Sequence, residues 1–68
     1  MIEFKLTSEY IELVRLLKAT NLVSSGGEAK MAVTDKLVKV NGETETRKRL
    51  KCTKGFVVSY KDEEIKIT

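Results

Sequence analysis

The densest group of charged side chains in the sequence lies between residues 36 and 55. This segment holds seven basic and two acidic residues, a net charge of +5, whereas residues 1–35 and 56–68 each carry −1. Arginine offers a planar fork of N–H donors that matches phosphate, and several cations together release the counterions condensed on a nucleic acid. The charge distribution therefore predicts a phosphate-binding surface, the alternative being a solvated loop on a basic protein. The candidate residues are Lys36, Lys39, Arg47, Lys48, Arg49 and Lys51, with Lys54 downstream.

A second candidate site is the helix start predicted just before this segment. Ser25 followed by Glu28 is a capping box, in which the serine oxygen accepts from a first-turn amide and the glutamate reaches back to the cap amide. Glycines in the first turn would let a sugar-phosphate backbone approach free amides, and serine hydroxyls would add donors. An ordinary capped helix is the alternative. The candidate residues here are Ser24, Ser25, Gly26, Gly27 and Lys30.

The residues that most enzymes and metal sites need are scarce. The chain has no histidine and one cysteine, Cys52, so the usual zinc ligand sets are missing and histidine-dependent catalysis is excluded. The carboxylates are scattered without a pocket that would raise their pKa values. We therefore expect a non-enzymatic protein without metal, cofactor or small-molecule substrate, and we expect Cys52 to be a small buried hydrophobe.

Aromatic residues offer little support for base stacking. The chain has only four, and three of them fall at core-type positions. Recognition should then rest on shape and phosphates, which favours structured RNA over a sequence-specific single strand. The four residues are Phe4, Tyr10, Phe56 and Tyr60.

Length and composition predict one domain over residues 1–68. A chain of 68 residues can bury only a thin core. Its single cysteine suits a reducing compartment, and no segment resembles a signal peptide or approaches the ~20 apolar residues of a membrane span. We expect a cytoplasmic monomer that does not enter membranes.

Two helices are predicted in the first half of the chain. Alternation of Ile2, Phe4 and Leu6 indicates a strand before them. The first helix should begin at a Thr7 or Ser8 cap and run to about residue 19 or 20, followed by Asn21 as a left-handed C-cap. It should bury one broad apolar face, formed by Tyr10, Ile11, Leu13, Val14, Leu16 and Leu17. The second helix should start at Ser25.

The second half of the chain predicts strands and tight turns. Val38 to Val40 alternates as a strand, and Asn41-Gly42 is the strongest short signal for a type I′ hairpin turn. The remaining expectations are a returning strand at residues 43–46, a loop or edge at 47–49, inward-facing Leu50 and Cys52, a turn at 53–55, a strand at 56–60 and a last strand around Ile65 and Ile67. The predicted class is α+β, with two short helices packed on one face of a small twisted antiparallel sheet that has extra terminal strands.

The order of these signals resembles a known family. The helix start at Ser25, Glu28, Ala29 and Lys30, then Val38-Lys39-Val40-Asn41-Gly42, then a Lys-Gly turn into Val57-Val58, is similar to the RNA-binding domain named after ribosomal protein S-four, or alpha-L motif. The similarity covers about residues 10–58 and is greatest with small stand-alone bacterial members. That family often carries an arginine near this helix start. Here Gly26 and Gly27 stand instead, which shifts the expected contacts towards backbone amides and Lys30.

The resemblance implies binding of structured RNA, of ribosomal or transfer RNA type, through the helix pair and the adjoining basic loop. An adaptor for protein assembly that keeps the fold without strong RNA affinity is the alternative. Steep weakening by salt would distinguish RNA binding from an apolar protein interface. DNA binding is a weaker third hypothesis, because the second helix lacks the Asn, Gln or Arg run of a major-groove reader.

Overall fold

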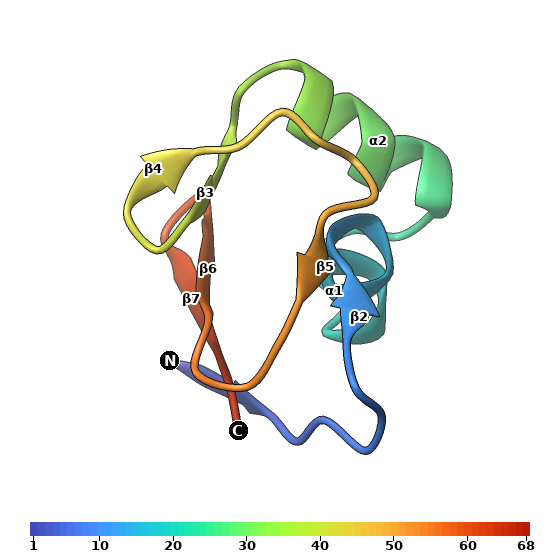
Figure 1. Ribbon diagram of the computed structural model, residues 1–68. Coiled ribbons are helices and arrows are strands. Elements are labelled where there is room, and N and C mark those ends of the chain that lie inside the picture. Colours follow the sequence, from blue (N-terminus) through green and yellow to red (C-terminus); the bar gives the residue numbers. More distant parts are fainter.

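Two helices lie beside a five-stranded sheet in the computed structural model, which describes residues 1–68 (Figure 1). In spatial order the strands are β1 (Ile2–Phe4), β7 (Glu63–Ile67), β6 (Val57–Tyr60), β3 (Val38–Val40) and β4 (Glu43–Thr44). The helices are α1 (Leu13–Ala19) and α2 (Gly26–Thr34), and a separate strand pair, β2 (Ile11–Glu12) with β5 (Lys51–Cys52), lies next to α1. The predicted α+β fold of two helices on a small sheet is confirmed.

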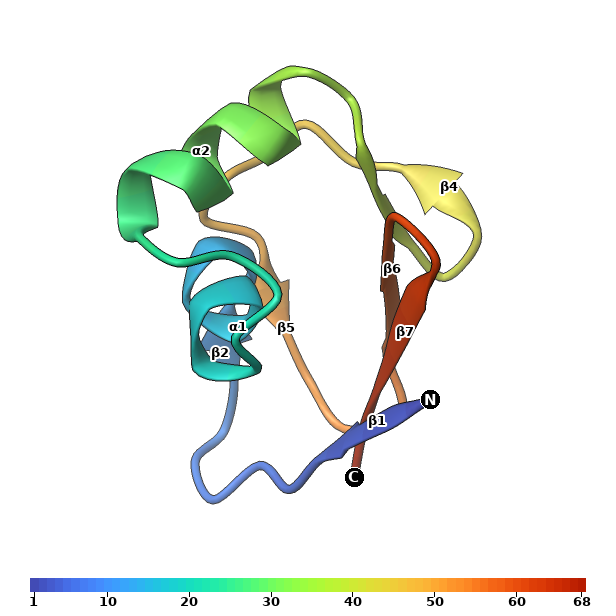
Figure 2. The same ribbon diagram turned by 180° about the vertical axis from the view of Figure 1, so that it is seen from behind.

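The sheet is mixed, whereas the sequence predicted an antiparallel one. The β3–β4, β3–β6 and β6–β7 pairs are antiparallel, but β1 runs parallel to β7 with Ile2 opposite Ile65. A short turn forces its two strands to be antiparallel, whereas β1 reaches β7 from the other end of the chain and has no such constraint. The two termini consequently lie together (Figures 1 and 2). Leu6 N–H donates to Thr68 O and Thr68 N–H donates to Phe4 O, each at 2.9 Å.

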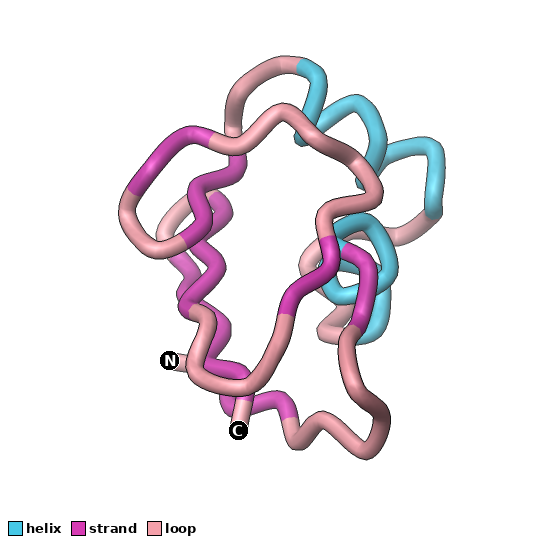
Figure 3. The backbone as a smooth tube through the Cα atoms, in the orientation of Figure 1, coloured by secondary structure: helices cyan, strands magenta, loops and turns pink.

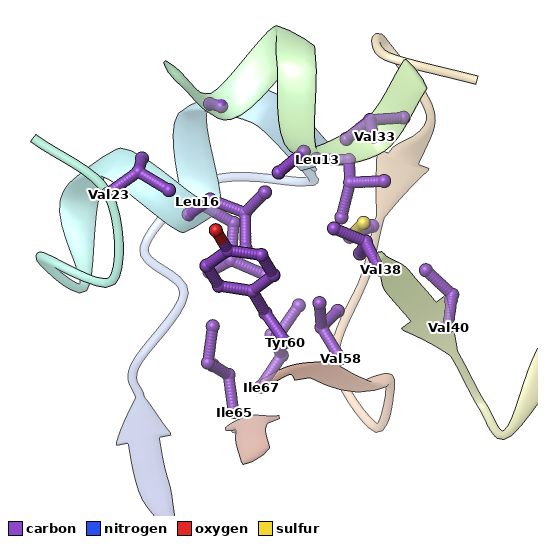
Figure 4. Close-up of a cluster of buried hydrophobic side chains, with 14 of the residues drawn as sticks. Leu13, Leu16, Val23, Val33, Val38, Val40, Val58, Tyr60, Ile65 and Ile67 are labelled. Carbon is purple, nitrogen blue, oxygen red and sulfur yellow. The ribbon is translucent and has the colours of Figure 1, made fainter. Parts of the chain in front are cut away.

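The core lies between the helices and the inner face of the sheet (Figure 4). The side chains of Leu13, Leu16 and Val33 meet those of Val58 and the other sheet residues there. Cys52 is fully buried within the same cluster, as predicted. The buried residues are Leu6, Leu13, Leu16, Leu17, Val23, Ala29, Ala32, Val33, Val38, Val40, Cys52, Val58, Tyr60, Ile65 and Ile67.

Three of the four aromatic residues belong to this core, and the fourth does not. Tyr60 is 4% exposed, and Phe4 and Phe56 are partly buried against the cluster. Tyr10 is 40% exposed and precedes β2, so its predicted place on the buried face of the first helix is wrong. An aromatic ring therefore remains at the surface.

The first helix begins later than the sequence predicted. Leu13 is its first residue, and neither Thr7 nor Ser8 caps it, since the Ser8 hydroxyl donates to Tyr10 O. The first-turn amides are satisfied by a distant segment instead: Leu13 N–H donates to Leu50 O at 2.9 Å, and Val14 N–H to Lys48 O at 3.2 Å. A cap supplied by another part of the chain leaves no local sequence signal.

Both helices end in the same way, with one residue in the left-handed conformation. Asn21 has φ 61° and the Leu22 N–H donates to Leu17 O, which confirms the predicted left-handed C-cap. Lys36 has φ 62° after α2, and the Leu37 N–H donates to Ala32 O. A lysine at such a position was not predicted, because asparagine or glycine is the usual residue there.

The hairpin turn agrees with the sequence, but the strand after it is shorter than predicted. Asn41 and Gly42 have φ values of 53° and 88°, as a type I′ turn requires. The strand β4 ends at Thr44 because the Glu45 carboxylate accepts from the amides of Thr46 and Arg47 and turns the chain away. A loop then crosses from β4 past α2 to β5 (Figure 3). Neither helix has the length and apolar character of a membrane span.

Candidate functional site

The loop between β4 and β5 carries the predicted basic cluster and is held against α1 by its own backbone. A turn closes between Arg47 and Leu50, whose N–H donates to Arg47 O at 3.3 Å. Since the carbonyls of Lys48 and Leu50 accept the first amides of α1, the backbone of the loop is fixed next to that helix. The side chains of Arg47, Lys48 and Arg49 are exposed. The loop therefore presents cations at a defined place beside the helix pair.

Four cations from three elements meet in one surface depression, which we call the basic hollow. It has a volume of about 470 Å³, and its lining residues are Glu12, Val14, Arg15, Lys30, Lys48 and Arg49. Lys30 comes from α2, Lys48 and Arg49 from the loop, and Arg15 from α1. No acidic group within 4 Å pairs with Arg15, Lys30 or Lys48. These three cations are available to an anionic ligand.

The structure thus brings three of the predicted residues together and adds one that the sequence did not single out. Arg15 was missed because its charge belongs to a segment with net charge −1. Arg15 and Lys18 both lie on the exposed side of α1, opposite Leu16 and Leu17. That helical spacing could have marked Arg15 as exposed, but only the folded chain places it next to Lys48.

The two loop arginines already contact carboxylates. Arg47 binds Glu45 through both arms of its guanidinium, with Nε–Oε2 at 2.9 Å and Nη2–Oε1 at 3.0 Å. This contact, with the amides of Arg47 and Thr46, lowers the pKa of Glu45 to about 2. Arg49 pairs with Glu12, with Nε–Oε2 at 3.2 Å. A phosphate that binds either arginine must displace or share these carboxylates.

The tip of α2 combines free amides with an internal carboxylate. Ser25 is the cap, since the Glu28 N–H donates to its Oγ at 3.1 Å, but the glutamate reaches one residue further back than the capping box predicts. Glu28 Oε1 accepts from the Ser24 amide at 2.8 Å and from the Ser24 hydroxyl at 2.7 Å, and these bonds lower the Glu28 pKa. The amides of Gly26 and Gly27 donate to no protein group. They remain open to a ligand, whereas the Ser24 hydroxyl is engaged.

The remaining predicted residues lie elsewhere. Lys36 lies two residues beyond the C-terminal end of α2, whereas the glycines are at its start. Lys39 alternates with buried Val38 and Val40 and so points away from the core, into a depression shared with Lys61. Lys51 lies on β5, close to the loop, in a depression that Arg47, Arg49 and Leu50 also line.

The Cys52 thiol has no metal-binding surroundings. No group of three His, Cys, Asp or Glu side chains comes together in the structure. Burial, together with the negative charge of Glu45, raises the Cys52 pKa to about 11, so the thiol stays protonated at neutral pH.

Comparison with known proteins identifies the fold. Residues 4–68 match the S4 domain family. The chain belongs to the S4 domain family. YbcJ of Escherichia coli strain K12, named as a candidate RNA-binding protein, is 40% identical over 58 residues, which cover 85% of this chain and 83% of YbcJ. YbcJ of Shigella flexneri is similar to the same extent but carries no functional name.

The solved structures agree with this assignment. The solution structure of Escherichia coli YbcJ is described as revealing an alpha-L motif involved in RNA binding. It superposes on this S4 domain with a TM-score of 0.78 and 38% sequence identity, covering 100% of this chain and 87% of YbcJ. The predicted resemblance to the alpha-L motif is therefore confirmed.

Proposed function

We propose that this S4 domain is a non-enzymatic module that binds structured RNA, of ribosomal or transfer RNA type, through its phosphates. The basic hollow is the observation that carries the proposal, because Arg15, Lys30 and Lys48 converge there from α1, α2 and the loop. Such a group of cations fits the closely spaced phosphates of a folded RNA better than a single small anion. The family and the description of YbcJ as RNA-binding support RNA as the polyanion.

The site extends from the basic hollow along the loop and to the tip of α2. We assign Arg49 to the hollow and Arg47 and Lys51 to its continuation along the loop. At the helix tip we assign the amides of Gly26 and Gly27, with Ser24 and Ser25 shaping the approach. Lys36 and Lys39 play at most a long-range part, because they lie outside the hollow.

The cellular setting follows from the proposed ligand. Structured RNA occurs in the cytoplasm, where the Cys52 thiol would also stay reduced. We take the active form to be a monomer.

A salt titration with two charge-matched variants tests the proposal. Lys30→Ala with Lys48→Ala removes two cations from the basic hollow, and Lys39→Ala with Lys61→Ala removes two from the depression on the sheet. Against a structured RNA such as a transfer RNA, the first variant should flatten the slope of log affinity against log salt by up to about two units. The second variant should keep the slope of the wild type, because its cations lie outside the site.

Three results would contradict the proposal. Equal slopes for the wild type and the hollow variant would show that the RNA interface lies elsewhere. A flattened slope for both variants would show that binding depends on net charge and not on the basic hollow. Undetectable binding by the wild type would favour the protein-adaptor hypothesis.

A further inference from the structure

Tyr10 is an exposed aromatic ring beside the proposed RNA site. Its side chain lies before β2, 40% exposed, and Lys51 Nζ of the neighbouring strand β5 stands 5.0 Å from the ring centroid. The other tyrosine, Tyr60, is buried at 4% exposure. The ring at residue 10 thus offers a flat apolar surface with a cation against it.

The ring lines a depression that joins the basic hollow. This second depression has a volume of about 500 Å³ and is lined by Ser8, Glu9, Tyr10, Ile11, Glu12 and Arg15. Glu12 and Arg15 line both depressions, so they share a wall. An RNA whose phosphates occupy the basic hollow would have its adjoining nucleotide at Tyr10.

We propose that Tyr10 stacks against one unpaired base of the bound RNA, while Arg15 holds the neighbouring phosphate. This inference rests on the proposed function and specifies its ligand as a structured RNA with a nucleotide bulged out of the helix. Stacking on an aromatic side chain accepts any base, since every base has a π face. Lys51 Nζ lies over the ring, 5.0 Å from its centroid, and does not line the depression, so the base stacks on the part of the ring that faces the depression.

The carboxylate of Glu9 favours a base over a phosphate in this depression. A carboxylate repels phosphate but accepts hydrogen bonds from N–H groups. Every unpaired base carries such a donor, since cytosine, adenine and guanine have amino groups and uracil has N3–H. Glu9 in the lining of the depression therefore supports the binding of a base there without selecting one base over another.

Three hairpins with equal numbers of phosphates test this inference. They share one stem and differ at a single bulged position, which holds a cytidine, a uridine or an abasic nucleotide. The wild type should bind the cytidine bulge about tenfold more tightly than the abasic bulge, within the range expected for stacking one base. The uridine bulge should bind about as tightly as the cytidine bulge, because stacking accepts any base.

Substitution of Tyr10 separates stacking from the phosphate contacts. Tyr10→Ala should bring the cytidine and abasic hairpins to equal affinity and leave the abasic affinity unchanged, whereas Tyr10→Phe should keep the tenfold preference. Thermal melts establish that both variants are folded, which the exposure of Tyr10 leads us to expect. Lys48→Ala is the control, because it should weaken binding of all three hairpins by the same factor.

The outcomes distinguish the two proposals. Equal binding of the cytidine and abasic hairpins by the wild type would overturn the stacking inference and leave the proposed function standing. Equal weakening of all three hairpins by Tyr10→Ala would also overturn it. Failure of the wild type to bind any hairpin would overturn the proposed function itself.

Discussion

The contact between Glu45 and Arg47 shows how one carboxylate can shape the basic loop. The Glu45 side chain accepts hydrogen bonds from two backbone amides and from the guanidinium of Arg47. The same carboxylate therefore ends β4 and orients the arginine. Surface ion pairs add little to stability, but a pair of this geometry holds a long side chain in place before a ligand arrives. Glu45, although acidic, therefore helps to position a cation of the basic loop.

Replacement of Glu45 should reveal this contact through its pH dependence. Because the folded state lowers the Glu45 pKa from 4.5 to about 2, the unfolded state binds a proton first as pH falls. The stabilisation is therefore complete above about pH 4.5 and is lost between 4.5 and about 2. Glu45→Gln should melt a few degrees below the wild type at pH 7, and the difference should vanish near pH 2.

Glu43→Gln is the matched control for this measurement. Glu43 lies on the same short strand, is exposed and makes no hydrogen bond through its side chain. Its replacement removes the same charge from the same part of the chain without breaking a side-chain hydrogen bond, so the melting temperature at pH 7 should stay close to that of the wild type. A difference between Glu45→Gln and wild type that persists unchanged at pH 2 would show that the charge of Glu45 does not stabilise the loop.

At the scale of elements, the sequence predicted correctly the features that interactions between nearby residues hold in place. The cap at Ser25 and the turn at Asn41 and Gly42 appear in the sequence because each feature is completed within a few residues. The predicted start of α1 was wrong by several residues, because the first amides of this helix donate to the distant carbonyls of Lys48 and Leu50. The partner strand of β1 was likewise set by the other end of the chain.

The end of α2 provides a test at the same scale. Lys36 has φ 62°, a conformation that costs a residue with a side chain about 1–2 kcal/mol and costs glycine none. Lys36→Gly should therefore raise the free energy of unfolding by about 1 kcal/mol, which is a rise of about 4–8 °C in melting temperature for a small domain. Lys30→Gly, in the interior of α2, should lower it by about 1 kcal/mol. Thermal denaturation followed by circular dichroism measures both, and a drop for Lys36→Gly would contradict the C-cap argument.

At the scale of the whole molecule, the excess of positive charge in residues 36–55 pointed to only two of the four cations of the basic hollow. Residues 36–55 pointed to Lys48 and Arg49, and the helix start pointed to Lys30. Arg15 could not be found in this way, because it enters the basic hollow only when α1 packs beside the loop. Lys39 was included because of its place in the sequence, although strand alternation turns it to the other side of the sheet. Charge along a chain thus predicts a basic surface cluster only where the basic residues are also neighbours in the fold.

The fold also separates the residues that stabilise the domain from those proposed to bind RNA. The core is formed by apolar side chains between helices and sheet, whereas the loop holds α1 through backbone carbonyls that remain when its side chains are changed. The combined variant Arg47→Ala, Lys48→Ala and Arg49→Ala should therefore melt within a few degrees of the wild type. Its salt slope for a structured RNA should flatten by up to about three units, and by less if Arg47 stays paired with Glu45 or Arg49 with Glu12 when RNA binds the wild type.

Ile65→Val is the matched control, because it should lower stability without changing the salt dependence of RNA binding. Ile65 is fully buried on β7, and removal of one methylene group from such a site costs about 0.5–1.5 kcal/mol. This variant should melt at a lower temperature and keep the full salt slope, measured where it is folded. A large loss of stability in the loop variant would show that its side chains, and not only its backbone, hold α1 in place. A flattened slope for Ile65→Val would show that the basic surface depends on tight packing beneath it, so that stability and binding cannot be changed independently.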